Sequence, residues 1–354
     1  MSLRELFGIE VPFIQAPMAG VQAAPLAVAI SNAGGLGSLP AALLSPEQLR
    51  RELEAIRDQT RYPFNVNFFC HNPPVPDAER ERAWRSLLMP YFEEFGIDAA
   101  DISGGASRTP FNEQVADIVE PFAPAVVSFH FGLPSRALLQ RVRSWGSRII
   151  ASATTVAEAM WLEQQGVDAV IAQGWEAGGH RGMFLTADVA TQVGTFALVQ
   201  QVARRTGLPV IAAGGIADET TVRAAFQLGA SAVQVGTAFL LCPECSTSAI
   251  HRAALQSESA RDTAVTNVFT GRPARGIVNR LMRDLGYING TAPEFPLAST
   301  ALAALRRAAE LRGSGDFSPL WCGQNATGCK AIPAVELMQE LVRGIPSLSS
   351  TGVS

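Results

Sequence analysis

The sequence predicts an α/β fold, a TIM barrel of eight parallel strands and eight helices, with an α-helical second domain inserted after the eighth strand. Short apolar runs recur along the chain, and most are followed by a helical pattern. The runs are almost continuously apolar, as strands of a parallel sheet covered on both faces must be. Eight strand–helix units are the number that closes a barrel. The runs occupy residues 13–18, 35–39, 64–69, 125–130, 148–152, 168–173, 209–213 and 232–236.

Residues that begin and end helices lie between these runs. After 148–152, Thr155 and Glu158 have the spacing of a capping box, and Gly166 stands where that helix should end. After 209–213, Asp218 is placed to cap a helix that stops near Gly229. Both units therefore read as complete strand–helix–strand segments.

Two segments fall outside the repeat. Residues 70–124 begin with a proline-rich stretch and are predicted to form an insertion after the third strand. We expect residues 243–330 to form a mostly helical domain over the catalytic face of a barrel that comprises residues 1–242. Residues 331–354 would be a last barrel helix and a tail, with an apolar stripe at helical spacing. The stripe consists of Ile332, Val335, Met338 and Val342.

Composition narrows the class of protein. The net charge of −4 comes without a basic stripe, which argues against a nucleic-acid partner. The chain has no uncharged apolar run of membrane-spanning length, and its amino terminus lacks the pattern of a signal peptide. We therefore expect a cytoplasmic protein whose partners are small neutral or anionic molecules, with no membrane association.

The five cysteines argue against a zinc site, and the single lysine argues against Schiff-base catalysis. The cysteines are odd in number and scattered, as in proteins of reducing compartments. Cys242 and Cys245 have zinc-knuckle spacing, but no second pair stands at a suitable distance, so we predict no metal site. Lys330 precedes a helix instead of ending a strand, which leaves Schiff-base chemistry without a nucleophile.

The ends of the last two strands predict a phosphate site. Gly214 and Gly215 follow the seventh strand, and Gln234, Val235, Gly236 and Thr237 end the eighth. Glycines let backbone N–H groups approach an anion, and barrels commonly bind phosphate at this corner. Asn67 and Gln173 at other strand ends could bond the edge of a planar heterocycle, and Met18 could lie against its face. Together these features suggest bound FMN in the barrel domain.

Two histidines are candidates for chemistry beside such a ring. His180 lies after the sixth strand, between glycines on a loop expected to be flexible, and its ordinary pKa near ~6.5 suits a general base. His130 ends the fourth strand on the same side as Ser128, where it could equally be a structural barrel histidine. His71 and His251 are expected to be ordinary residues, the second of them on an exposed helix.

Three carboxylates could also be proposed as bases. They are Asp101, Glu176 and Asp188. Glu176 is close to His180 in sequence, but we expect it to fix the loop by accepting backbone N–H bonds. No Ser/His/Asp order or phosphate-binding P-loop emerges.

Several blocks of sequence resemble the bacterial class I nitronate monooxygenases, formerly called 2-nitropropane dioxygenases. The similarity runs over nearly the whole chain, from residue 12 to residue 324. The most specific blocks are 127–134 (VSFHFGLP) and 173–180 (QGWEAGGH). Further blocks lie at 12–20, 65–69, 213–216, 234–237 and 272–276.

The resemblance implies a function and a set of site residues. The function is FMN-dependent oxidation of alkyl nitronates, such as propionate 3-nitronate, by O2 to a carbonyl compound and nitrite through an anionic flavosemiquinone. His180 matches the family's catalytic histidine, and His130 matches a residue of its substrate pocket. The FMN contacts carried over by position are Met18, Asn67, Gln173, Gly178, Gly215, Gln234, Val235, Gly236 and Thr237.

The sequence departs from the class I pattern in one segment, and two other functions stay open. In class I enzymes the segment that corresponds to 295–303 carries tyrosines and a lysine facing the substrate, whereas Ser299 and Ala303 would occupy two of those places here. The main alternative is an NAD(P)H-dependent FMN reductase of the enoyl reductase or quinone reductase type. The other is a flavin-binding barrel without turnover. The sequence leaves open whether the protein is a monomer or a homodimer.

Overall fold

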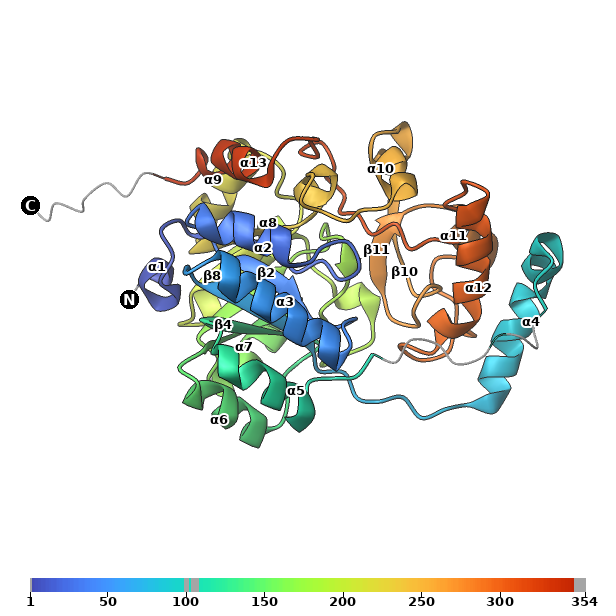
Figure 1. The fold of residues 1–354 in the computed structure, drawn as a ribbon, viewed down its shortest axis with the longest axis horizontal. Coiled ribbons are helices and arrows are strands. Elements are labelled where there is room, and N and C mark those ends of the chain that lie inside the picture. The colour runs from blue at the N-terminus through green and yellow to red at the C-terminus, as the bar shows by residue number, and fades with distance from the viewer. Residues whose placement is uncertain (1, 99–101, 103–107, 347–354) are drawn as a thin grey trace, which may run out of the picture.

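The computed structural model describes residues 2–98, 102 and 108–346. All eight expected apolar runs form strands of one parallel sheet, so the predicted barrel is confirmed (Figure 1). The barrel strands are β1 (Phe13–Gln15), β2 (Gly37–Pro40), β3 (Phe64–Phe69), β4 (Val126–His130), β5 (Arg148–Ala153), β6 (Ala169–Gln173), β8 (Val210–Ala213) and β9 (Ala232–Val235).

The sheet closes between its first two strands. Its hydrogen-bonded order is β1-β9-β8-β6-β5-β4-β3-β2, which leaves β1 and β2 at the two edges. Gln15 N–H donates to the Leu36 carbonyl oxygen (3.0 Å), and Leu36 N–H donates to that of Phe13 (2.9 Å). These bonds join the edges, so the barrel interior is enclosed.

One helix follows each barrel strand and packs on the outside of the sheet (Figure 1). These helices are α2 (Ala24–Asn32), α3 (Pro46–Gln59), α5 (Glu113–Val119), α6 (Arg136–Ser144), α7 (Val156–Gln164), α8 (Thr195–Arg205), α9 (Glu219–Gln227) and α13 (Ala334–Val342). Short 3-10 turns are η2 (Glu120–Phe122), η3 (Val189–Thr191), η4 (Thr237–Leu241) and η5 (Glu258–Arg261).

The amino-terminal end of the barrel is plugged by α1 (Leu3–Phe7). Leu3 and Phe7 of this helix are buried in one cluster with the inward-facing Ile14, Ile150 and Ile211 of the strands. This apolar plug fills the end of the barrel opposite to the carboxyl ends of the strands. The polar interior residues of the barrel therefore gather at the other end, where barrel enzymes place their sites.

The predicted helix ends are largely confirmed. The Asp218 side chain accepts from Thr221 N–H in a full capping box, and Gly229 follows α9 with φ +100°. Thr155 caps α7 and Gly166 ends it at φ +78°, but the Glu158 carboxylate does not close the capping box. It is fully buried and accepts instead from Thr154 and from Phe184 N–H, which ties the segment after β7 to α7.

The apolar stripe of α13 differs from the predicted one. Its buried residues are Ala334, Leu337, Met338 and Leu341. Only Met338 belongs to the predicted set, because Ile332 precedes the helix and Val335 and Val342 are half-buried. The helix nevertheless packs on the barrel wall beside α2 and α9, as expected.

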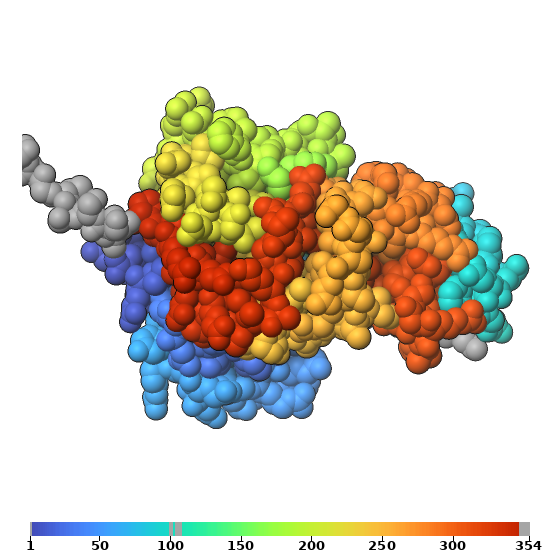
Figure 2. Space-filling model, turned by 90° about the horizontal axis from the view of Figure 1, so that it is seen from above, coloured from blue at the N-terminus to red at the C-terminus, as the bar shows by residue number. Residues whose placement is uncertain are grey.

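Residues 70–124 contain both an excursion and a barrel helix. The excursion carries α4 (Ala78–Phe95) to the far end of the molecule, whereas α5 packs beside α3 and α6 (Figure 1). There α4 lies against α12 (Ala298–Leu311), with α10 (Ala249–Leu255) and α11 (Arg280–Leu285) in the same half of the molecule (Figure 2). Trp84 of α4 donates its indole N–H to the Ala298 carbonyl oxygen (3.3 Å).

A second sheet joins this half to the barrel. It consists of β10 (Thr263–Thr266), β11 (Ala274–Ile277) and β7 (Gly179–His180), in antiparallel register. Residues 243–330 were expected to be mostly helical, and these strands were not predicted from the sequence. The boundaries at residues 242 and 330 stay a prediction.

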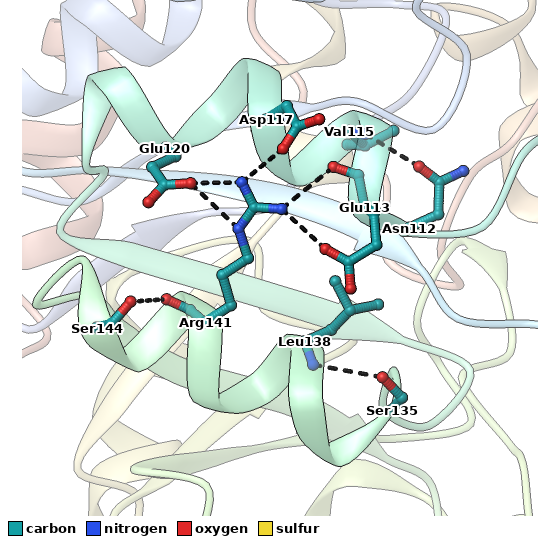
Figure 3. Close-up of polar contacts among 9 residues, drawn as sticks. All are labelled: Asn112, Glu113, Val115, Asp117, Glu120, Ser135, Leu138, Arg141 and Ser144. Atoms are coloured by element: carbon teal, nitrogen blue, oxygen red, sulfur yellow. Dashed lines mark hydrogen bonds and ion pairs between the residues drawn. The ribbon is translucent and has the colours of Figure 1, made fainter.

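An ion-pair network fastens α5 to α6 on the barrel surface (Figure 3). The half-buried Arg141 guanidinium contacts the carboxylates of Glu113 (2.8 Å), Asp117 (2.6 Å) and Glu120 (2.5 Å). All four groups are solvent-accessible, so salt screens the attraction between them. The network helps to hold the two helices together and lies on the outer surface of the barrel, away from the site at the strand ends.

Candidate active site

Several of the predicted polar residues meet inside the carboxyl end of the barrel. His130, Gln173 and Gln234 alternate in phase with the interior apolar residues of their strands, and Asn67 is in phase with the buried Asn65 of β3. Asn67 donates to the hydroxyl of Ser128 (2.9 Å), and that hydroxyl also accepts from Asn65 (2.9 Å). Alternation therefore places four side chains from separate strands on one polar layer.

His180 lies in a short strand and not on a flexible loop. Gly179–His180 pairs with Ala274 and Arg275 of β11, which fixes the backbone on one side. On the other side, the Gln173 side chain donates to the His180 carbonyl oxygen (2.9 Å) and accepts from Gly182 N–H (2.7 Å). The expectation of flexibility was wrong because tertiary pairing orders this glycine-rich segment.

Both ring nitrogens of His130 are used within the protein. Its Nε2 lies 3.1 Å from the His180 carbonyl oxygen, which can only accept, so this nitrogen carries the proton. Its Nδ1 then accepts from the Ser152 hydroxyl (3.0 Å). Burial lowers the pKa of His130 to about 3, so the ring is neutral at physiological pH.

The His180 ring sits among aromatic side chains and one hydroxyl. Its Nε2 lies 2.9 Å from Thr270 Oγ1. Its centroid lies 5.3 Å from that of Phe295, 5.9 Å from that of Phe131 and 5.4 Å from that of Trp321. Burial, and then the nearby charge of Arg108, hold the pKa of His180 well below its ordinary value. His180 is therefore a neutral imidazole at neutral pH, as a general base must be.

Three residues around His180 were not predicted from the sequence. His71, expected to be ordinary, is only 5% exposed and lies edge-on to Phe295, with ring centroids 4.8 Å apart. The Arg108 guanidinium lies over the Phe295 ring (5.0 Å), and Arg272 lies over Phe131 (3.9 Å). Arg272 belongs to a sequence block noted above, whereas nothing local in the sequence marks Arg108. His251 is also buried, at 4% exposure, contrary to expectation.

Two loops offer unpaired backbone donors to an anion. Within the described part of the chain, no acceptor pairs with the backbone N–H groups of Gly215, Gly236 or Thr237. One segment holds both loops in place, because Asn325 donates to the Gly215 carbonyl oxygen (3.1 Å) and Gly323 N–H to Thr237 Oγ1 (3.0 Å). Gly215 has φ +72°, which favours glycine.

Three further residues predicted to contact the cofactor, Met18, Gly178 and Gln234, lie at or near the same loops. Gln234 Oε1 is buried without a hydrogen-bond partner, so the barrel interior presents an unused acceptor. The Met18 sulfur lies 3.6 Å from where a Cβ on Gly236 would stand, beside the same loop. At Gly178 a Cβ would lie 2.6 Å from the Gly323 nitrogen, so this glycine permits two backbone segments to cross.

The carboxylates do not approach His180 as bases. Glu176 accepts from Thr195 N–H and from the Thr195 hydroxyl (both 2.7 Å), the loop-fixing role expected of it. Asp188 is exposed and caps η3, and Asp101 lies outside the described residues. Among the residues that the structure describes, no three His, Cys, Asp or Glu side chains are arranged to hold a metal ion. Nor does any helix there have the length and apolar character to cross a membrane.

The segment 295–303, in which a departure from the family was expected, carries no charged side chain. Ser299 donates its hydroxyl to the Pro296 carbonyl oxygen (2.7 Å), and Ala303 is exposed on α12. Positive charge near His180 comes instead from Arg108 and Arg272, on other elements.

Comparison with known proteins identifies the family. The family model described as nitronate monooxygenase matches residues 1–344. A nitronate monooxygenase of Pseudomonas aeruginosa is 45% identical, over 95% of this chain and 97% of its own. One of Paraburkholderia phytofirmans is 42% identical, over 97% and 94% of the two chains. The solved structure of a nitroalkane oxidase from Streptomyces ansochromogenes is 35% identical with a TM-score of 0.87, and the match covers 97% of this chain and 98% of that one. The protein therefore belongs to the nitronate monooxygenase family and is an oxidoreductase.

Proposed function

We propose that this enzyme oxidises alkyl nitronates, such as propionate 3-nitronate, with O2 to a carbonyl compound and nitrite, using FMN held at the carboxyl end of the barrel. The observation that carries the proposal is the neutral, half-buried His180 ring, which contacts Phe295 and Phe131, while an arginine guanidinium lies over each of these two rings. A neutral base beside positive charge suits abstraction of an α proton from a nitroalkane, because the nitronate produced is an anion.

The hydrogen bonds around Thr270 support a specific tautomer of His180. We propose that the Thr270 hydroxyl donates its single proton to the Arg272 carbonyl oxygen, 3.3 Å away, which can only accept. Thr270 Oγ1 then accepts from His180 Nε2–H (2.9 Å) and from Arg272 N–H (3.4 Å). This arrangement leaves the lone pair on Nδ1 of His180, which we propose as the atom that takes the proton.

The residues present fit FMN. The unpaired N–H groups of Gly215, Gly236 and Thr237 would hold its phosphate. Gln234, with its unpartnered Oε1, and Asn67 would meet the ring edge, with Met18 by the ring face. Bound flavin would supply the electron transfer between nitronate and O2. The protein's part is to hold the substrate, exclude water and move the α proton.

His130 would act on the reaction through His180. The sequence predicts a substrate-pocket residue, but both of its ring nitrogens have protein partners. We therefore propose that His130 is a positioning residue for His180, and that Gln173 shares this role through the same carbonyl oxygen.

The decisive experiment measures product and oxygen together. The purified protein, assayed for FMN, is mixed with propionate 3-nitronate while O2 uptake and nitrite release are followed. Both should occur without NADH. Anaerobic bleaching of the flavin by NADH, with no nitrite from any nitronate, would instead establish the NAD(P)H-dependent reductase. Flavin binding with neither reaction would indicate a barrel without turnover.

The base role has its own test. His180→Asn should lower the rate with neutral nitroethane by about 10²- to 10⁴-fold, the usual contribution of a general base. Ethyl nitronate arrives already ionised, so its oxidation should fall much less. Equal losses on both substrates would mean that proton abstraction is not the main task of His180.

We propose that the protein is cytoplasmic. All five of its cysteines are free, and free cysteines are typical of proteins in a reducing compartment.

A further inference from the structure

Two guanidinium groups near His180 lack a salt bridge to any described carboxylate, although the charge of Glu158 acts on Arg272 from beyond salt-bridge distance. Arg108 and Arg272 form no ion pair with a described carboxylate, and Arg272 bonds only the Met183 carbonyl oxygen with its Nη2. Burial lowers the pKa of each arginine to about 10, so both remain charged at neutral pH. Half-buried cations without counter-charges are costly, and a native fold normally pairs them.

Buried donors on both groups are also unused. Arg108 Nη1 and Arg272 Nε are buried without hydrogen-bond partners. Unsatisfied buried polar atoms of this kind are rare in native proteins, and a bound acceptor is a common reason for them.

The aromatic rings bring these donors to one place beside His180. Arg108 lies over Phe295 and Arg272 over Phe131, and the centroids of those rings are 5.5 Å apart. The same two rings contact the His180 imidazole. Phe131 is held at φ +71°, a strained conformation for a bulky residue, which indicates that its position matters.

We propose that Arg108 and Arg272 bind the anionic groups of the substrate beside His180 and determine its specificity for negatively charged nitro compounds. The inference rests on the proposed function. Arg108 belongs to the segment between α4 and α5, and Arg272 to the turn between β10 and β11. The excursion after β3 and the second sheet thus each contribute one cation to a site at the barrel mouth.

Calorimetry with succinate, a dianion of similar length that the flavin cannot oxidise, tests the binding without electron transfer. Succinate is titrated into the flavin-loaded protein and into Arg108→Gln and Arg272→Gln variants. Each variant should raise Kd by about 10- to 100-fold, as expected for a lost hydrogen bond to a charged group. Arg307→Gln, at an exposed position of α12, is the matched control and should leave Kd unchanged. Unchanged Kd in both arginine variants overturns the proposal.

Measurements of turnover distinguish substrate binding by the two arginines from nitronate oxidation, the proposed function on which that binding role depends. The kcat/KM for propionate 3-nitronate should fall more than that for ethyl nitronate, since the second substrate carries one anionic group fewer. Equal losses overturn the specificity role. Nitrite release with arginine-independent binding would defeat this inference alone, whereas arginine-dependent binding without oxidation of any nitronate would defeat only the proposed function. Because Arg272 also bonds Met183, thermal unfolding is compared, and Arg108→Gln decides the result if Arg272→Gln is misfolded.

Discussion

The Nε2–H of His130 donates to the backbone carbonyl oxygen of His180, 3.1 Å away, and the Gln173 side chain donates to the same oxygen from 2.9 Å. Two side chains from neighbouring regions of the barrel thereby hold one peptide group. Since the His180 ring projects from that peptide, its direction depends on both bonds. The strand pairing of Gly179–His180 with β11 adds a third constraint.

Removing the His130 donor should disturb catalysis more than folding. In His130→Phe the His180 carbonyl oxygen keeps only the Gln173 bond, so we expect kcat with nitroethane to fall by about tenfold with little change in KM. His130→Gln can place an N–H near the same oxygen and should recover most of the loss. Steady-state kinetics of both variants check this. A change confined to KM would support the substrate-contact role expected from the sequence.

Thr270 should control the protonation state of His180. Thr270→Val has a similar shape but cannot accept from Nε2–H, so the base tautomer is no longer favoured. We expect kcat with nitroethane to fall by about tenfold and its pH profile to shift, while oxidation of ethyl nitronate changes little. Thr270→Ser keeps the hydroxyl and serves as the control. If Thr270→Val retains the wild-type pH profile, the proposed tautomer is wrong.

Gly178 should be intolerant of any side chain. A Cβ there would meet the Gly323 nitrogen at 2.6 Å and the Cys322 carbonyl carbon at 2.7 Å, both backbone atoms that cannot turn aside. Gly178→Ala should push the 321–325 segment away and so weaken the phosphate loops that this segment fastens. Equilibrium dialysis should show weaker FMN binding, and thermal unfolding a lower Tm. Gly290→Ala, where a Cβ meets nothing within 4 Å, should change neither.

The barrel could be predicted from sequence because its determinants are local. Each strand is a short apolar run, and Asp218, Thr155 and Gly166 mark helix ends by their own side chains or backbone freedom. The position of His180 at a strand end was predictable for the same reason. Its place in a strand was not, because a two-residue strand has no alternation to detect and is held by pairing with β11 and by the bonds from His130 and Gln173.

The cationic side of the site could not be predicted because it is assembled from distant segments. His71, Arg108 and Arg272 are brought together around the rings of Phe131 and Phe295. No spacing rule relates them, and His71 stands before a proline-rich stretch that looks like an ordinary loop. His251 was misjudged for a related reason: helix α10 is short, and its buried face is defined by contact with the segment around Trp321.

The four histidines make stability depend on pH in a definite direction. Burial, the largest cause in each case, lowers the pKa to about 4 for His71 and His251, to about 3 for His130, and well below the ordinary value for His180. In the unfolded chain all four should titrate near ~6.5. Unfolding therefore takes up protons below that pH, so the stability contribution is complete above about 6.5 and is lost as the pH falls toward the folded pKa values.

The urea midpoint should fall steadily between pH 6.5 and 5, a window above the range in which most carboxylates titrate. In His251→Gln the slope should be shallower by about one proton, since the other three histidines remain. A midpoint that stays constant from pH 7 to pH 5 would show that the histidines are not buried in their neutral form.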